Sequence, residues 1–214
     1  MDRKKEIVKA INDMSGSRSS YEVFYDWIAL MALSIQNSCY QIHDRTWEKR
    51  EEEYMRIITP YGGKGKRFAE LSALLVETMD HSMSDVLGEI FMESGFGSKR
   101  AGQFFTPFNL SLLCARINVK AANERVTLNE PSCGSGGMVI ATARAMLEKG
   151  IDYQKKLKVI AQDLDWKAVY MCYVQLSLYG IDAEVIQGNT LTDPYKTAYP
   201  CERVFKTPKK MGIL

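Results

Sequence analysis

One glycine-rich stretch decides the fold of this chain: Asn129-Glu130-Pro131-Ser132-Cys133-Gly134-Ser135-Gly136-Gly137. The apolar residues Val126-Thr127-Leu128 before it predict a strand, and residues 138–147 after it predict a helix that ends near Gly150. A glycine turn in this position lets a ligand approach bare backbone and points unpaired helix N–H groups at it. The stretch therefore predicts a small-molecule pocket, although such a turn also occurs as a simple tight connection.

Two common nucleotide-binding loops do not fit this turn. A dinucleotide fingerprint needs a third glycine, but Val139 stands at that position, and this argues against an NAD-dependent oxidoreductase. A phosphate-binding P-loop needs Gly-Lys-Ser/Thr after the turn, and this chain has none there. The turn alone therefore does not identify the ligand.

Two further strand-and-turn units come later in the chain. Residues 157–162 predict a second strand that ends at Asp163, residues 166–179 a helix, and residues 183–187 a third strand with Gly188-Asn189-Thr190-Leu191 as its exit turn. A carboxylate at the tip of the second strand can accept hydrogen bonds from both hydroxyls of a ribose. Alternatively, Asp163 caps the helix that begins at Trp166. Three such units are typical of a doubly wound nucleotide-type site.

Taken together, four separated motifs resemble one known family. They are Gly102-Gln103-Phe104-Phe105-Thr106-Pro107, the stretch from Glu130 to Gly137, Ala161-Gln162-Asp163, and Gly188-Asn189-Thr190-Leu191. In this order and spacing they resemble the modification (methylase) subunits of type I restriction-modification systems, which are adenine-N6 DNA methyltransferases. The resemblance covers about half of the chain, from Asp85 to Pro194.

The resemblance implies S-adenosylmethionine as the cofactor and gives each motif a role. Phe104, Phe105, Thr106 and Pro107 would surround the methionine end, Asp163 would take the ribose hydroxyls, and Glu130 would lie near the amino group. Asn189 stands beside the adenine where the family usually has Asp, and its carbonyl can still accept a hydrogen bond from the amine. The turn that would hold the amino-acid moiety comprises Glu130, Pro131, Ser132, Gly134, Ser135, Gly136 and Gly137.

The catalytic motif of that family, Asn-Pro-Pro-Phe or a close variant, is missing, so no catalytic residue is assigned. Asp193-Pro194-Tyr195 is interpreted as a turn. The best positional match is residues 204–209, a short fourth strand followed by Lys206, whose ammonium group cannot accept a hydrogen bond from adenine. Two functions remain open: a DNA methyltransferase completed by a partner, and a non-catalytic regulatory or docking module that binds S-adenosylmethionine. The missing motif favours the second for this chain alone.

The first half of the chain reads as helical. Apolar residues recur at helical spacing over 21–40, 47–58, 68–79 and 83–92, with Ser84 as the expected cap of the last helix. The predicted fold is α/β, a helical region (1–100) packed on a truncated Rossmann-like methyltransferase sheet (101–214). The first strand would have a free edge, and exposed edges invite pairing. We expect the C-terminal tail, the helical region or a second copy in a homodimer to cover it.

The amino-acid composition limits which functions, ligands and cellular locations are expected. A net charge of +2 is too small to indicate DNA binding by itself, so DNA and a specificity or methylase partner subunit are implied by the resemblance alone. Five cysteines without Cys-x-x-Cys spacing predict reduced thiols and a cytoplasmic location, with Cys133 as a small filler of the turn. Two unpaired histidines predict no metal site, and the absence of a long apolar run predicts no membrane span. The start at Met1 without a tag favours a short natural protein over an excised piece.

Overall fold

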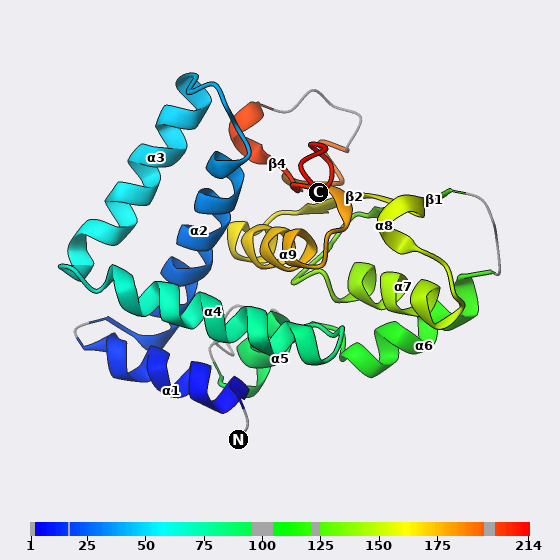
Figure 1. The fold of residues 1–214 in the computed structure, drawn as a ribbon, viewed down its shortest axis with the longest axis horizontal. Helices are drawn as coiled ribbons and strands as arrows, with labels where there is room; N and C mark the ends of the chain where they lie inside the picture. The colour runs from blue at the N-terminus through cyan, green and yellow to red at the C-terminus, as the bar shows by residue number, and fades with distance from the viewer. Residues whose placement is uncertain (1–2, 17, 96–104, 121–124, 195–199) are drawn as a thin grey trace.

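The computed structural model describes residues 3–16, 18–95, 105–120, 125–194 and 200–214 (Figure 1). A four-stranded sheet has the order β1-β2-β3-β4, with β1 (Val126–Glu130), β2 (Leu157–Asp163), β3 (Asp182–Gln187) and β4 (Val204–Lys206). The first three strands run parallel, so their carboxyl ends meet at one edge of the sheet. The α/β fold and all four predicted strands are confirmed.

The fourth strand runs in the opposite direction to the other three. Val185 pairs with Phe205 and Ile186 with Val204, and β4 is antiparallel to β3. Thr207, the residue after β4, is fully buried, and its hydroxyl donates to the carbonyl of Ile181 at the start of β3 (2.7 Å). The prediction that residues 204–209 match the catalytic position is therefore wrong, because antiparallel pairing carries Lys206 to the far edge of the sheet.

The crossover helices are α7 (Gly137–Glu148), the short α8 (Tyr153–Lys156) and α9 (Trp166–Leu178), and α7 and α9 lie on the same face of the sheet in Figure 1. Thr127 and Asn129 on β1 and Lys158 on β2 are exposed. Strands with one covered face show such alternation, whereas strands covered on both faces are apolar throughout. The sheet thus departs from the doubly wound arrangement, since within the described residues these two helices share one face.

Helices precede the sheet: α1 (Arg3–Ser15), α2 (Ser20–Ser38), α3 (Arg45–Ile58), α4 (Gly65–His81), α5 (Val86–Glu93) and α6 (Phe108–Asn118). Helices α2, α3, α4 and α5 were predicted, whereas α6 and α1, whose buried residues Ile7, Ile11 and Met14 share one face, were not. The predicted Ser84 cap is wrong. Asp85 caps α5 instead, since its carboxylate accepts from the backbone N–H of Gly88 (3.0 Å). This difference of one residue places a carboxylate next to the glycine turn.

The helical region packs on the sheet through α2. A capping box of Ser19 and Glu22 starts this helix, and its residues Trp27 and Ile28 are almost fully buried. Helix α2 lies against α9, and buried apolar residues of both regions form one continuous cluster. Complete burial of side chains of this size contributes about 1.5–3 kcal/mol each, so α2 anchors the helices to the sheet. A division at residue 100 into two domains stays a prediction.

The free edge of β1 is present as expected, because within the described residues β1 pairs with β2 alone. The C-terminal tail lies elsewhere, beside α2, where the Gln36 side chain contacts the Met211 sulfur at 3.8 Å. The helical region reaches the sheet at α9 (Figure 1). Of the three candidates expected to cover the edge of β1, the C-terminal tail is therefore excluded. Coverage by the helical region or by a second copy stays a prediction.

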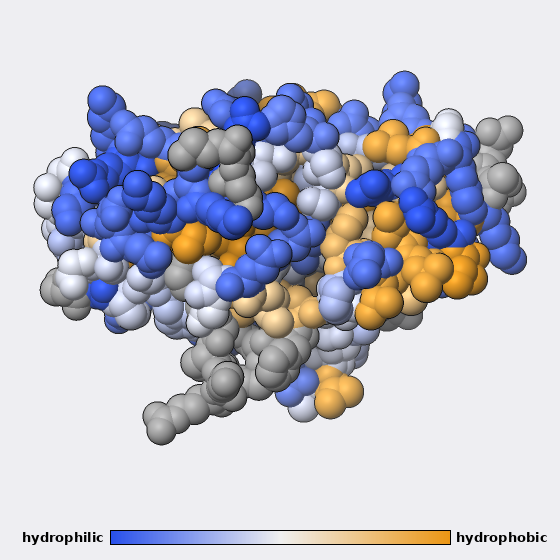
Figure 2. Space-filling view, turned by 90° about the horizontal axis from the view of Figure 1, so that it is seen from below, coloured by the Kyte–Doolittle hydropathy of each residue, from blue (hydrophilic) through white to orange (hydrophobic). Residues whose placement is uncertain are grey.

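Helix α6 carries an exposed apolar stripe near that end of the molecule. Leu110, Leu113 and Ile117 recur at helical spacing and are 49%, 55% and 72% exposed. Figure 2 shows hydrophobic residues gathered on this face at the end where Figure 1 has α6. The opposite face of the helix, with Ser111, Leu112 and Ala115, is buried, and α6 packs on α7.

Cysteine chemistry and membrane segments add little to this picture. All five cysteines are free thiols, and Cys133 is 5% exposed, which confirms its interpretation as a filler. Among the helices described, none has the length and apolar character needed to cross a bilayer. The described residues also hold no cluster of three or more potential metal ligands.

Candidate functional site

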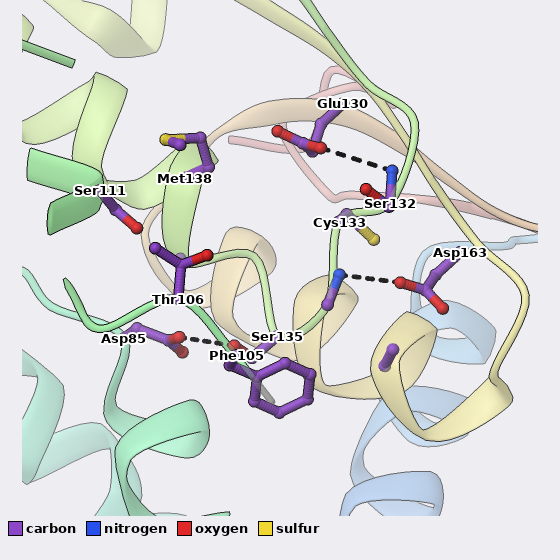
Figure 3. A pocket seen from close by; sticks show the side chains of 13 residues that line it. Asp85, Phe105, Thr106, Ser111, Glu130, Ser132, Cys133, Ser135, Met138 and Asp163 are labelled. Atoms are coloured by element: carbon purple, nitrogen blue, oxygen red, sulfur yellow. Dashed lines mark hydrogen bonds between the residues drawn. The ribbon is translucent and has the colours of Figure 1, made fainter. Parts of the chain in front are cut away.

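A cavity of about 490 Å³ opens at the carboxyl ends of β1 and β2, beside the glycine turn (Figure 3). Ligand pockets in proteins typically enclose about 300–1,000 Å³. Its wall is formed by the glycine turn, the ends of β1 and β2, the N-cap of α5, the segment before α6, and residues of α6, α7 and α9. The lining residues are Asp85, Phe105, Thr106, Ser111, Glu130, Ser132, Cys133, Gly134, Ser135, Gly137, Met138, Asp163 and Ala168.

The turn has a shape that only glycine permits at two positions. Gly134 and Gly136 have φ angles of +54° and +97°, in the left-handed region that side chains disfavour. A Cβ atom on Gly134 would also lie 2.9 Å from the Phe105 ring, and one on Gly136 would lie 3.2 Å from the Cys172 sulfur. The turn therefore carries no side chain at these two positions and packs closely on Phe105, which lines the cavity, and on Cys172.

Asp163 holds the turn from the end of β2. One oxygen of its carboxylate accepts from the Gly134 N–H at 2.9 Å (Figure 3), and the other accepts from the Asp165 N–H at 3.0 Å. The N-cap of α9 is Asp165, which accepts from the Lys167 N–H at 3.0 Å. The alternative that Asp163 caps this helix is therefore wrong, and its carboxylate lines the cavity beside the turn.

Asp85, which the sequence interpretation missed as a site residue, is the centre of a buried hydrogen-bond network. It is 3% exposed and accepts from the Ser135 hydroxyl at 2.5 Å and from the Gln175 side-chain amide at 2.8 Å. The same amide donates to the Ser135 carbonyl (2.8 Å), and its oxygen accepts from the Leu87 N–H (3.0 Å). Asp85 thus ties α5 and α9 to the glycine turn.

A local signal for Asp85 does exist in the sequence. Asp is a preferred N-cap residue, and Gly88 stands three positions later, where the cap bond is received. A Cβ atom at position 88 would lie 2.2 Å from the Asp85 carboxylate and 2.5 Å from the Ser135 hydroxyl. The partners in the turn and on α9 lie 50 and 90 residues away, and spacing in the chain does not reveal them.

The cavity is acidic. Asp85, Glu130 and Asp163 line it, and no Lys, Arg or His does so among the described residues. Burial raises the pKa of the Glu130 carboxyl, an effect that the Ser132 N–H opposes and the Asp163 charge reinforces. Burial also raises the pKa of Asp85, and it outweighs the three donated hydrogen bonds that favour the charged form. A cationic ligand in the cavity would favour the charged form of both carboxyls and so oppose this rise of their pKa.

Most of the predicted binding residues lie together. Phe105, Thr106, Glu130, Ser132, Gly134, Ser135, Gly137 and Asp163 line the cavity. Pro107 lines a neighbouring cavity instead, whereas Pro131, Gly136 and Asn189 line neither. The prediction for Phe104 lies outside the described residues.

The exit turn of β3 is hydrogen-bonded to the segment that follows β1. Asn189 uses its side-chain oxygen to accept from the Leu191 N–H (3.0 Å), and the Thr190 hydroxyl donates to the Pro131 carbonyl (2.6 Å). The Asp193 N–H donates to the Asn189 carbonyl (2.7 Å), so the described part of the Asp193-Pro194-Tyr195 motif is a turn, as predicted. Tyr195 itself lies outside the described residues.

Comparison with known proteins places these features in a family context. The model of the N-6 DNA methylase family matches residues 80–209, which include the glycine turn, Asp85 and Asp163. The methylase subunit of the type I restriction enzyme MjaIX from Methanocaldococcus jannaschii is 28% identical over 113 residues. That match covers 50% of this chain and 19% of the relative, so the chain spans about a fifth of the relative's length.

Two solved structures resemble the chain at low identity. The type I restriction-modification methyltransferase subunit from Streptococcus thermophilus has a TM-score of 0.46 and 19% identity, over 92% of this chain and 41% of that one. A putative class I S-adenosylmethionine-dependent methyltransferase from Listeria monocytogenes has a TM-score of 0.48 and 14% identity, over 90% and 56%.

Proposed function

Because the chain belongs to the N-6 DNA methylase family, we propose that it binds S-adenosylmethionine in the cavity beside the glycine turn. The match covers more than half of the chain and spans every strand of the sheet. Bound there, S-adenosylmethionine would supply an activated methyl group. The family's substrate is adenine in DNA, and we extend that substrate to the assembly in which this chain takes part.

The charge of the cavity is the observation that carries this proposal. S-adenosylmethionine has a sulfonium and an ammonium group against one carboxylate, so it is a net cation. Three carboxylates with no basic lining residue among those described suit such a ligand. The pyrophosphate of a dinucleotide would meet the same carboxylates and be repelled. The acidic lining therefore favours S-adenosylmethionine over NAD, in agreement with the missing third glycine.

The residues present fit the cofactor in other respects. Asp163 stands at the tip of β2, where a carboxylate can accept from ribose hydroxyls while it keeps its bond to Gly134. Glu130 lies within the cavity wall as an acceptor for the ammonium group. At Gly134 a Cβ atom would meet the Phe105 ring at 2.9 Å, so this ring packs on the glycine turn and forms part of the cavity wall.

Methyl transfer to adenine needs more than this chain supplies. The target amine has to be held by acceptors, and Lys206 has only donors and lies at the opposite edge of the sheet. We therefore propose that a partner, either a specificity or a methylase subunit, completes the catalytic site. The second candidate is a non-catalytic module that binds the cofactor and docks on a restriction-modification complex, and the direction of β4 favours it for the chain alone.

Calorimetric titration with S-adenosylmethionine tests cofactor binding. The parent protein is expected to bind, and Asp163→Ala is expected to lose most of the affinity, because the carboxylate meets both the ligand and the turn. Asp165→Ala is the matched control, since it removes the cap of α9 two residues away and leaves the cavity wall unchanged. Absence of binding by the parent protein would refute the proposal.

A methylation assay separates the two candidates. Transfer of a tritiated methyl group to adenine-containing DNA is measured with the chain alone and with candidate partner subunits. The enzyme hypothesis predicts incorporation only with a partner, and loss of that incorporation in Asp163→Ala. Cofactor binding with no incorporation under any pairing would leave the docking module as the function.

A further inference from the structure

Ser111 on α6 carries a hydroxyl group that the protein itself does not use. The residue is 1% exposed, and its Oγ atom has no hydrogen-bond partner within the described part of the chain. A buried hydroxyl without a partner is destabilising, so such groups are rare unless a ligand or water meets them. This one lines the cavity beside the glycine turn.

The orientation of this hydroxyl is also unusual for a helix. Buried Ser and Thr side chains commonly donate to the carbonyl four residues earlier, as Thr142 does to Met138 at 2.9 Å. In α6 the corresponding carbonyl belongs to Pro107, and among the described residues it accepts only from the backbone N–H groups of Leu110 and Ser111. The Ser111 hydroxyl is therefore turned away from its own backbone, and Figure 3 shows it directed toward Thr106.

The surroundings decide which ligand group would meet this donor. Figure 3 places Ser111 and Asp163 at opposite ends of the cavity, with the glycine turn between them. If Asp163 takes the ribose, the Ser111 end receives the amino-acid end of the cofactor. A carboxylate there finds no described basic side chain, so it needs neutral donors. The start of α7 is close by, and no described side chain caps it.

We propose that the Ser111 hydroxyl donates a hydrogen bond to the carboxylate of bound S-adenosylmethionine, together with N–H groups at the start of α7. This proposal rests on the proposed cofactor binding and adds a residue that none of the four sequence motifs contains. It also explains why a polar residue stands on the buried face of α6, beside Leu112 and Ala115.

The test compares two ligands that differ in a single group. Parent protein and Ser111→Ala are titrated with S-adenosylmethionine and with decarboxylated S-adenosylmethionine. We expect Ser111→Ala to weaken binding of the first about ten- to a hundredfold, the effect of one lost hydrogen bond to a charged group, and to leave the second unchanged. Ser177→Ala is the matched control, because its hydroxyl is also buried without a partner in the described residues but does not line the cavity.

The outcomes separate this inference from the proposed function. Equal affinity of parent and Ser111→Ala for S-adenosylmethionine would overturn the role of Ser111 and leave cofactor binding intact. An equal loss for both ligands would also overturn it, since the effect would then be structural. Failure of the parent protein to bind S-adenosylmethionine would refute the proposed function and this inference with it.

Discussion

The Asp85 network makes a quantitative prediction about stability. In Asp85→Ala three donors lose their acceptor: the Gly88 N–H, the Ser135 hydroxyl and one N–H of Gln175. Loss of the N-cap bond costs about 1 kcal/mol. Each of the other two buried donors adds about 1–3 kcal/mol when it is left without a partner. Because water can enter from the adjoining cavity, the lower part of this range applies, and the expected loss is about 3–5 kcal/mol.

Urea unfolding followed by circular dichroism measures this loss. Asp44→Ala is the matched control, since Asp44 caps α3 through the Thr46 and Trp47 N–H groups but is exposed and has no buried network. The control is expected to lose about 1 kcal/mol. Asp85→Asn keeps one carbonyl oxygen for the cap, and the Ser135 hydroxyl can turn to accept from its amide. We therefore expect it to lose less than half as much as Asp85→Ala.

The expected loss of stability in Asp85→Ala is large enough for the experiment to refute the role of the Asp85 network. A domain has only about 5–15 kcal/mol of net stability, so a loss of about 3–5 kcal/mol shifts the unfolding midpoint strongly. If Asp85→Ala lost no more than Asp44→Ala, the carboxylate would serve as a cap alone, and the links to the turn and to α9 would contribute nothing. The same variant is also expected to bind S-adenosylmethionine more weakly, because the turn loses its support at Ser135.

Three further predictions each concern the substitution of one residue. Gly134→Ala is expected to bind S-adenosylmethionine at least tenfold more weakly in calorimetry, because its Cβ atom would displace the Phe105 ring. Gly150→Ala is the control: Gly150 also has a positive φ angle, but a Cβ atom there would meet open space, so this variant should bind normally. The raised pKa of Glu130 means that the folded state holds this proton more tightly than the unfolded state does. The free energy of unfolding is therefore expected to fall as pH rises above about 4.5, and Glu130→Gln should flatten that slope in urea titrations at pH 4.5–7. Leu113→Lys is expected to change the unfolding free energy by less than about 0.5 kcal/mol, because this side chain is exposed; a larger loss would show that it packs in the core.

The strands and the turn were predictable because their signals are local. A short apolar run before Gly134 and Gly136 specifies a strand, a tight turn and a helix start without help from the rest of the chain. The tip of β2 at Asp163 is predictable in the same way. Asp85 and Ser111 were missed as site residues because their roles depend on neighbours brought close by folding. Each offered only a local hint, Asp85 as an N-cap residue three positions before Gly88 and Ser111 as a polar residue within the apolar pattern of α6.

Helix α1 and the direction of β4 were missed for different reasons. Helix α1 is mostly polar with three buried residues on one face, and this weak pattern gains its meaning from packing on α2 and α4. The direction of β4 is fixed by tertiary contacts: Thr207 binds the start of β3, and the Lys206 N–H donates to the Gln36 side chain on α2 (2.8 Å). Strand propensity gives no information about direction, so the sequence pattern predicted the strand and not its orientation.

The direction of β4 also limits how a catalytic group can reach the cofactor cavity. On the β3 side, two hydrogen bonds tie the segment after β3 to its neighbours: the Thr190 hydroxyl donates to the Pro131 carbonyl, and the Gln162 side chain donates to the Asp193 carbonyl (2.8 Å). On the other side, β1 ends at Glu130 within the cavity wall, and its outer edge has no described neighbour. A partner strand that paired with β1 in parallel would end beside the glycine turn, since parallel strands share their carboxyl edge. The acceptors that methyl transfer requires are therefore expected to arrive over the free edge of β1, and a bulky charged substitution there, Asn129→Arg, should abolish partner-dependent methylation while calorimetric binding of S-adenosylmethionine persists.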